Sequence, residues 1–72
     1  MAISQDNLDN WFTYHPPTND QKIRYEAIRE AAKAFATVIV ENTPPSADQT
    51  AAIRKVREAT MTANQCLACG GQ

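Results

Sequence analysis

The sequence has little glycine, one histidine and almost no net charge, and each shortage excludes a class of protein. Gly70 and Gly71 are the only glycines, so a glycine-rich phosphate-binding loop is excluded. The formal net charge of −1 is unlike the basic surface that binds polymeric DNA or RNA through many phosphates. Because catalytic motifs are also missing, we expect a binding protein and not an enzyme, without a cofactor or a metal.

Long hydrophobic runs are missing too. The most apolar stretch, residues 31–40, contains Lys33 and is too short to span a bilayer. The first residues lack the basic and apolar regions of a signal peptide. We therefore expect a cytoplasmic protein without membrane contact, in which Cys66 and Cys69 stay reduced.

Large apolar side chains are scarce because alanine dominates the hydrophobic content. The 72 residues include only two Phe and one Trp. A domain of this length buries about 60% of the surface that its unfolded chain exposes. Such chains usually need disulfides, a metal or partner subunits for stability. We therefore predict a compact homo-oligomer.

Two proline pairs, at residues 16–17 and 44–45, divide a single helical domain of residues 1–72 into three segments. The N-terminal arm, residues 1–17, is expected to contain a short helix capped by Ser4. A helix of two or three turns is marginal alone in water, so its apolar residues must dock on the rest of the chain.

The other two segments, residues 18–42 and 46–69, are predicted to be long helices. Each begins with a capping-box signature, formed by Thr18 with Gln21 and by Ser46 with Gln49. Apolar stripes with 3–4 spacing run along both helices, through Tyr25, Ile28, Ala32, Phe35 and Ile39 and through Ile53, Val56, Thr60, Ala63 and Leu67. The short connection predicts an antiparallel hairpin and an all-α fold, and the terminal glycine pair predicts the end of the second helix.

The first long helix has further small apolar residues outside its stripe, namely Ala27, Ala31, Ala34 and Val38. Taken together with the thin core, they predict an interface, most economically with a second copy of the chain. Helix propensity alone explains any single alanine. The rival interpretation is an adaptor that binds a host protein through this alanine-rich face.

Three of the five aromatic residues, together with the single histidine, lie in residues 11–15, directly ahead of the first proline pair. Alternate residues of an extended segment point to opposite faces, which predicts that Phe12 anchors in the core and Tyr14 faces outward or toward a neighbouring subunit. A stiffly held, exposed tyrosine can stack on a nucleobase. The alternative is that these rings only attach the arm to the hairpin.

A row of cations follows one side of the first long helix. Lys22, Arg29 and Lys33 fall within a sector of about 40°, suited to holding phosphates. For most of these residues we interpret the row as an ordinary charged surface with helix-surface ion pairs, namely Lys22–Glu26, Glu26–Arg29 and Glu30–Lys33, so that only one or two cations need be functional.

The pair Cys66 and Cys69 has the spacing of redox and metal motifs. A redox pair usually lies at a helix N-terminus, whereas this pair lies near a C-terminus. Structural zinc needs four ligands, and His15 is the only other obvious one. We interpret the cysteines as small helix-face residues; a redox protein or an intersubunit four-cysteine site is the alternative.

The strings FTYHPP, RYEAIREAAKAFA and VREATMTAN, in this order around the proline turn, resemble the small phage anti-CBASS sponge proteins. The resemblance covers residues 12–68. It implies a helical hairpin with a short N-terminal helix, assembled as a compact homohexamer. It also implies that the chain binds and sequesters cyclic oligonucleotides without cleaving them, which blocks bacterial antiphage immune signalling in the host bacterial cytosol.

The resemblance also implies site residues. Tyr14 corresponds to the tyrosine that stacks on a base, Arg29 to the cation that contacts phosphate, and Lys33 is the next candidate. His15 and Tyr25 complete the ligand-binding set that we expect for cyclic dinucleotides. Relatives that also bind cyclic trinucleotides have an arginine near the chain end, where residues 66–70 have none. A second site for trinucleotides is therefore assigned only to the candidates Arg54, Arg57 and Asn64.

Overall fold

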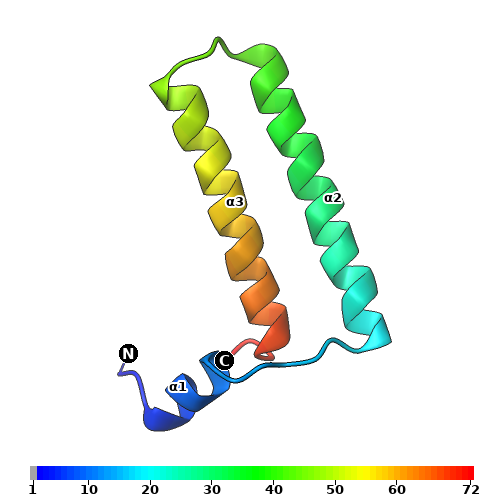
Figure 1. Cartoon of the computed structure of the whole chain (residues 1–72), viewed down its shortest axis with the longest axis vertical. Helices are drawn as coiled ribbons and strands as arrows, with labels where there is room; N and C mark the ends of the chain where they lie inside the picture. Colours follow the sequence, from blue (N-terminus) through cyan, green and yellow to red (C-terminus); the bar gives the residue numbers. More distant parts are fainter. Residues whose placement is uncertain (1) are drawn as a thin grey trace.

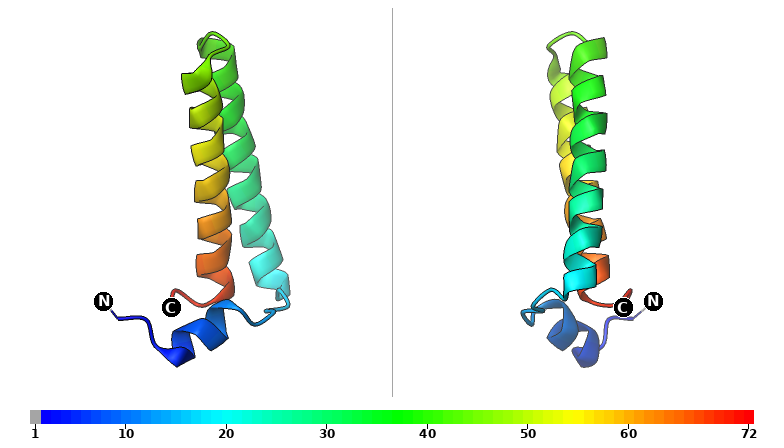
Figure 2. Two further views of the ribbon diagram at one scale, coloured as in Figure 1. Left: turned by 60° about the vertical axis from the view of Figure 1, so that its left-hand side comes forward. Right: turned by 90° about the vertical axis from the view of Figure 1, so that its right-hand side faces the viewer.

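The computed structural model describes residues 2–72 and forms three helices. They are α1 (Gln5–Trp11), α2 (Asn19–Asn42) and α3 (Ala47–Ala68), and no strand occurs in this range. α2 and α3 lie side by side and antiparallel, and α1 lies beneath the end of the hairpin that is opposite the turn (Figure 1). Turned views show that the hairpin is a single layer of helices (Figure 2). The predicted all-α hairpin is confirmed.

Polar side chains cap the first two helices and explain where they begin. Ser4 Oγ accepts a hydrogen bond from the Asn7 amide at 3.1 Å, and Asn7 Oδ1 accepts from the Ser4 amide at 3.0 Å. Thr18 and Gln21 form the same reciprocal box, at 3.1 and 3.0 Å. Both satisfy amides that have no partner within the helix.

The expected capping box of α3 is only half correct. Ser46 Oγ accepts from the Gln49 amide at 3.1 Å, as predicted. The Gln49 side chain does not reach back to Ser46; its Nε2 donates to the carbonyl and the hydroxyl of Thr43, both at 3.1 Å. Gln49 thus ties the turn to the end of α2, where Pro44 prevents another helical bond.

Two glycines end α3 in a Schellman motif. The Gly71 amide donates to the Cys66 carbonyl at 2.8 Å and the Gly70 amide to the Leu67 carbonyl at 3.4 Å. Both glycines have positive φ, +66° and +80°, a conformation that side chains with a Cβ disfavour. The glycine stop expected from the sequence is confirmed.

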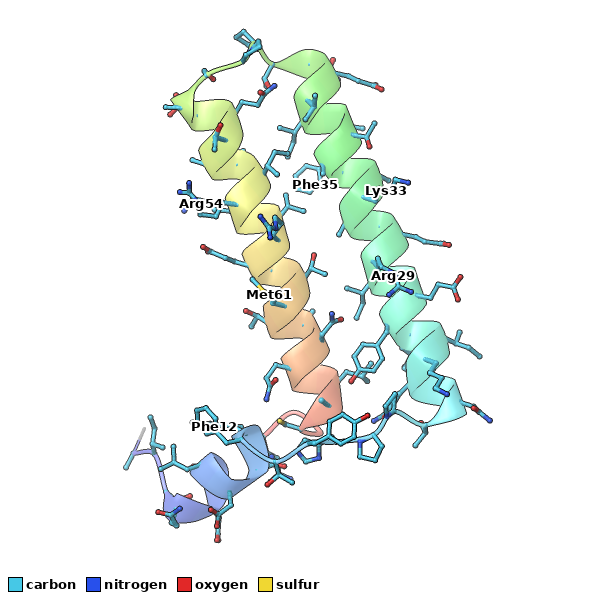
Figure 3. All side chains as sticks on the ribbon, viewed as in Figure 1. Phe12, Arg29, Lys33, Phe35, Arg54 and Met61 are labelled. Carbon is cyan, nitrogen blue, oxygen red and sulfur yellow. The ribbon has the colours of Figure 1, made fainter. Side chains whose placement is uncertain are left out.

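α2 and α3 meet along one seam of half-buried residues. In α3 the seam matches the predicted stripe. In α2 it runs through Gln21, Tyr25, Ile28, Ala32, Ala36 and Ile39. The prediction that Phe35 belongs to this stripe is wrong, since its side chain is 60% exposed. The small Ala36 occupies the seam instead, and the Phe35 side chain projects from α2 on the side that faces α3 (Figure 3).

The isolated hairpin has almost no core. Among residues 2–72, Cys69 alone is buried, at 8% exposure. The chain exposes 5835 Å², whereas a compact monomer of its mass, 8.0 kDa, exposes about 4,450 Å². Its radius of gyration is 15.2 Å, against about 11 Å for a compact domain of this length. None of the helices in residues 2–72 has both the length and the apolarity needed to cross a membrane.

Candidate ligand-binding site

Cationic and polar side chains surround a hollow on one side of the seam. We call it the tyrosine groove; it has a volume of about 330 Å³ and is lined by Lys22, Tyr25, Arg29, Thr60 and Asn64. The Thr60 hydroxyl donates to the Val56 carbonyl at 2.8 Å, so its oxygen remains able to accept a further hydrogen bond. The groove therefore combines an aromatic side chain, two cations and an amide, groups that suit a polar, anionic ligand.

A second hollow continues along the same side toward the turn. This arginine groove has a volume of about 340 Å³. Its cations are Arg29, Lys33 and Arg57, and its remaining lining residues are Ala32, Ala36, Ile53, Val56, Thr60 and Met61. Because Arg29 and Thr60 line both hollows, the two grooves adjoin. Each volume lies at the lower end of the range of small-molecule sites.

The cations of the two grooves are not neutralised within the chain. In residues 2–72 the only salt bridge joins Arg24 to Asp20, at 2.8 Å, and this hydrogen-bonded carboxylate raises the pKa of Arg24. The three predicted pairs, Lys22–Glu26, Glu26–Arg29 and Glu30–Lys33, are absent, so the prediction that they form is wrong. Figure 3 shows Arg29 and Lys33 projecting from neighbouring turns of α2. Their charges are thus available to an anion.

Asn64, which lines the tyrosine groove, carries an unsatisfied polar atom. Its Oδ1 is shielded from solvent and has no hydrogen-bond partner among the described residues. An unpaired polar atom of this kind costs about 1–3 kcal/mol, so a ligand or a partner that supplies a donor would recover this free energy.

Tyr14 lies on the extended segment between α1 and α2 and lines neither groove. Its side chain is 81% exposed. The segment is fixed on both sides: His15 Nε2 is 2.6 Å from the Asn10 carbonyl, and Gln21 Nε2 donates to the Leu67 carbonyl at 3.4 Å. The Tyr14 ring is therefore presented to the outside on a short segment with fixed ends.

The arm docks through Trp11. Trp11 is half-buried, and its Nε1 donates to the Gln72 carbonyl oxygen at 2.7 Å. The prediction that Phe12 anchors in the core is wrong for this chain, because Phe12 is 85% exposed and points away from the hairpin (Figure 3). α1 ends with Phe12 as its C-cap, and the thin hairpin has no core beneath that position.

The structure thus brings together some of the predicted site residues and separates others. Arg29 joins Tyr25 in one groove and Lys33 in the next. Of the candidates for a trinucleotide site, Asn64 is in the tyrosine groove and Arg57 in the arginine groove. The third, Arg54, points away from α2 and shares with Arg57 a separate hollow beside Gln49, Thr50 and Ile53 (Figure 3).

Sequence patterns did not indicate the groups that hold the arm in place. Gln65 Nε2 donates to the Trp11 carbonyl at 3.2 Å, and Asn10 Nδ2 donates to the Cys69 carbonyl at 3.2 Å. These contacts join residues more than fifty positions apart, and no local spacing signals them. His15 was expected to bind ligand, but one of its ring nitrogens is already paired with the arm.

The two cysteines are free thiols at the end of α3. Cys66 is exposed, whereas the buried Cys69 Sγ accepts from Gln65 Nε2 at 3.0 Å. Within residues 2–72, no three His, Cys, Asp or Glu side chains come together as metal ligands.

Comparison with known proteins identifies the family. No curated protein and no solved structure matches the chain. The Acb2/Tad1 hairpin domain matches residues 4–68, almost the whole chain and the full extent of the three helices. This match confirms the resemblance found in the sequence. The chain therefore belongs to the Acb2/Tad1 hairpin-domain family, the anti-CBASS sponges, which sequester cyclic oligonucleotides.

Proposed function

We propose that this chain binds cyclic dinucleotides, holds them without cleaving them and so blocks antiphage immune signalling in the host bacterial cytosol. The observation that carries the proposal is the set of unpaired cations beside the seam, headed by Arg29, which lines both grooves. An arginine without a carboxylate partner can grip a phosphate with two parallel hydrogen bonds. Sequestration requires only such binding, and no nucleophile, general base or metal.

In the proposed site Tyr14 stacks on a base, and Arg29 contacts a phosphate. Tyr25 and Lys33 flank Arg29 and complete the grooves. Stacking on an aromatic ring contributes about 1–3 kcal/mol per base. His15 is a further candidate ligand contact, and its hydrogen bond with the Asn10 carbonyl orients the arm that carries Tyr14. Cyclic trinucleotides are a further candidate ligand, with Arg54, Arg57 and Asn64 as candidate contacts.

The functional unit is proposed to be a compact homohexamer. Tyr14 lines neither groove of its own chain, so assembly can bring the Tyr14 of one copy to the Arg29 of another. The surface in excess of a compact monomer, about 1,400 Å² per chain, supports the assembly. A cyclic dinucleotide has approximate two-fold symmetry, which suits a two-fold interface that presents the same residues to both halves.

A protein-interaction adaptor is the alternative function. The adaptor function is favoured by an apolar groove on the other side of the seam. This groove is lined by Ile28, Ala31, Ala32, Phe35, Val56, Ala59, Thr60 and Ala63. We assign this surface to contacts between copies of the chain, because it continues the exposed alanines of α2. A host helix bound at this groove by a chain that ignores nucleotides would reverse the assignment.

Thermal unfolding with a panel of cyclic di- and trinucleotides tests the proposal. A ligand at about 100 times its dissociation constant stabilises the native state by roughly 2.7 kcal/mol. Each kcal/mol raises the midpoint of a domain this small by about 4–8 °C. We expect a shift with dinucleotides that disappears in Tyr14→Ala and in Arg29→Ala. No shift with any cyclic nucleotide, in protein that sedimentation shows to be oligomeric, would refute the proposal and favour the adaptor.

A further inference from the structure

We propose that Arg57 of α3 forms, with Arg29 and Lys33 of α2, an anion subsite in the arginine groove that holds a phosphate group of the bound cyclic oligonucleotide. This inference rests on the proposed function. It moves Arg57 from the candidates for a separate trinucleotide site to the site that contains Arg29.

The first argument is the balance of charge. Three cations from two helices line one hollow, and none of the other lining residues carries a carboxylate. Of the nearby acidic residues, Glu30 and Glu58 line none of the grooves described above, and Glu41 lines an adjoining hollow that also contains Lys33. None of the three forms a salt bridge within residues 2–72. Like charges brought together raise the free energy of the folded chain, and a bound anion lowers it. The net charge of the chain is only −1, so this excess of positive charge is local.

The second argument is the floor of the groove. Ala32, Ala36, Ile53 and Val56 are half-buried apolar residues of the helix seam. Arg29, Lys33 and Arg57 are exposed above this floor, and the four apolar side chains offer no competing donor or acceptor, so an anion there is held by the cations.

The third argument concerns the chemistry of the anion. Two guanidinium groups and an ammonium group provide donors only, arranged from both sides of the seam. A phosphate diester offers two non-bridging oxygens that match the fork of an arginine. Because Arg29 lines both grooves, a ligand that reaches Arg29 through the tyrosine groove can extend a second phosphate toward Arg57.

Lys55 provides a matched control for Arg57. Both are exposed cations on α3, but Lys55 lines none of the hollows described here. Lys55→Gln and Arg57→Gln therefore remove the same charge from the same helix, and they differ in whether the lost charge faces the groove. Arg57→Lys keeps the charge and removes the bidentate fork.

Inorganic pyrophosphate is a suitable probe because its binding does not require the proposed function. In the full chain, the Nε–Hε signals of the arginines are followed by NMR during titration with pyrophosphate, against sodium chloride at equal ionic strength. We expect the Arg29 and Arg57 signals to shift together and saturate. Arg24, which is held by Asp20, serves as the internal control and is expected to stay in place.

The variants give the decisive comparison. Affinity measured at Arg29 should fall about tenfold or more in Arg57→Gln, since a charged hydrogen bond contributes about 1.5–3 kcal/mol. It should fall less in Arg57→Lys and stay unchanged in Lys55→Gln. Equal affinity in Arg57→Gln and Lys55→Gln, or shifts of all arginines that only follow salt, would overturn the subsite.

A cyclic dinucleotide titration separates the two proposals. If the unaltered chain binds no cyclic nucleotide, the proposed function fails, whatever pyrophosphate does. If it binds a dinucleotide and Arg57→Gln binds it as tightly as Lys55→Gln, the subsite fails while the proposed function stands. A change of molecular mass in Arg57→Gln, measured by light scattering, would overturn the subsite and assign Arg57 to a contact between copies.

Discussion

Gln65 of α3 donates a hydrogen bond to the main-chain carbonyl of Trp11 at 3.2 Å, and the same Nε2 group lies 3.0 Å from Cys69 Sγ. One side chain thereby joins the last turn of α1 to the end of α3. Three residues after Trp11 comes Tyr14, the proposed stacking residue. The position of Tyr14 relative to the hairpin thus depends in part on a residue that lines neither groove.

Gln65→Ala is expected to loosen the arm. A hydrogen bond of this kind contributes about 0.5–1.5 kcal/mol, so the free energy of unfolding should decrease by that amount. Hydrogen exchange at the amides of residues 12–15 should accelerate, while the middle of α2 stays protected. Thr62→Ala is the control, because Thr62 is an exposed residue of the same helix without a side-chain hydrogen bond to the described residues. Unchanged exchange in the arm would show that the contacts of Trp11 and Asn10 hold it without Gln65.

Local sequence rules predicted the helices because the chain obeys them at its ends. Ser4, Thr18 and Ser46 each accept a hydrogen bond at a helix start, and glycines with positive φ end α3. These signals lie within a few residues of the boundary that they determine. The spacing of apolar residues by three and four predicts the stripe of α3 correctly, because this spacing is also a local property of the helix.

The positions of Phe12 and Phe35, which the sequence predicts wrongly, depend on contacts between distant parts of the chain. The alternation of an extended segment assigns Phe12 to the core, and 3–4 spacing assigns Phe35 to the stripe, but a hairpin of two helices has no interior that could enclose them. Arg57 and Arg29 lie 28 positions apart in the sequence, so only the antiparallel pairing of α2 and α3 brings them to one groove. The family resemblance supplied Tyr14 and Arg29; the structure adds the groove that links Arg29 to Arg57.

Asn64→Leu is expected to leave the unliganded protein as stable or to stabilise it by up to about 1–3 kcal/mol. The substitution removes the buried, unpaired Oδ1 and keeps a similar volume. Chemical denaturation without ligand measures this change. If Asn64 also contacts the ligand, the same variant binds the dinucleotide more weakly, as calorimetry would show. A large loss of stability without ligand would mean that assembly supplies a partner for Oδ1.

Gly70→Ala is expected to destabilise the end of α3. The residue has a φ of +66°, where a Cβ costs about 1–2 kcal/mol, although no atom lies within 4 Å of an added Cβ. The cost therefore comes from the backbone and not from a clash. Gly70→Asn, which tolerates this conformation better, should lose less. Equal melting temperatures for the alanine variant and the unaltered chain would show that the Schellman turn contributes nothing to stability.

Phe35→Arg is expected to break the assembly and, with it, ligand binding. Phe35 is 60% exposed in the single chain and lines the apolar groove that we assign to contacts between copies. Burying an arginine there without a partner is costly, so the variant should remain as smaller species by light scattering. Thr62→Arg places the same charge on an exposed position of α3 outside the described grooves, and should keep the mass of the unaltered protein. Because Tyr14 lines neither groove of its own chain, smaller species should also bind dinucleotide weakly. If the Phe35→Arg protein stays assembled, the interface between copies lies elsewhere. If it dissociates and still binds the dinucleotide at full affinity, a single chain completes the ligand site.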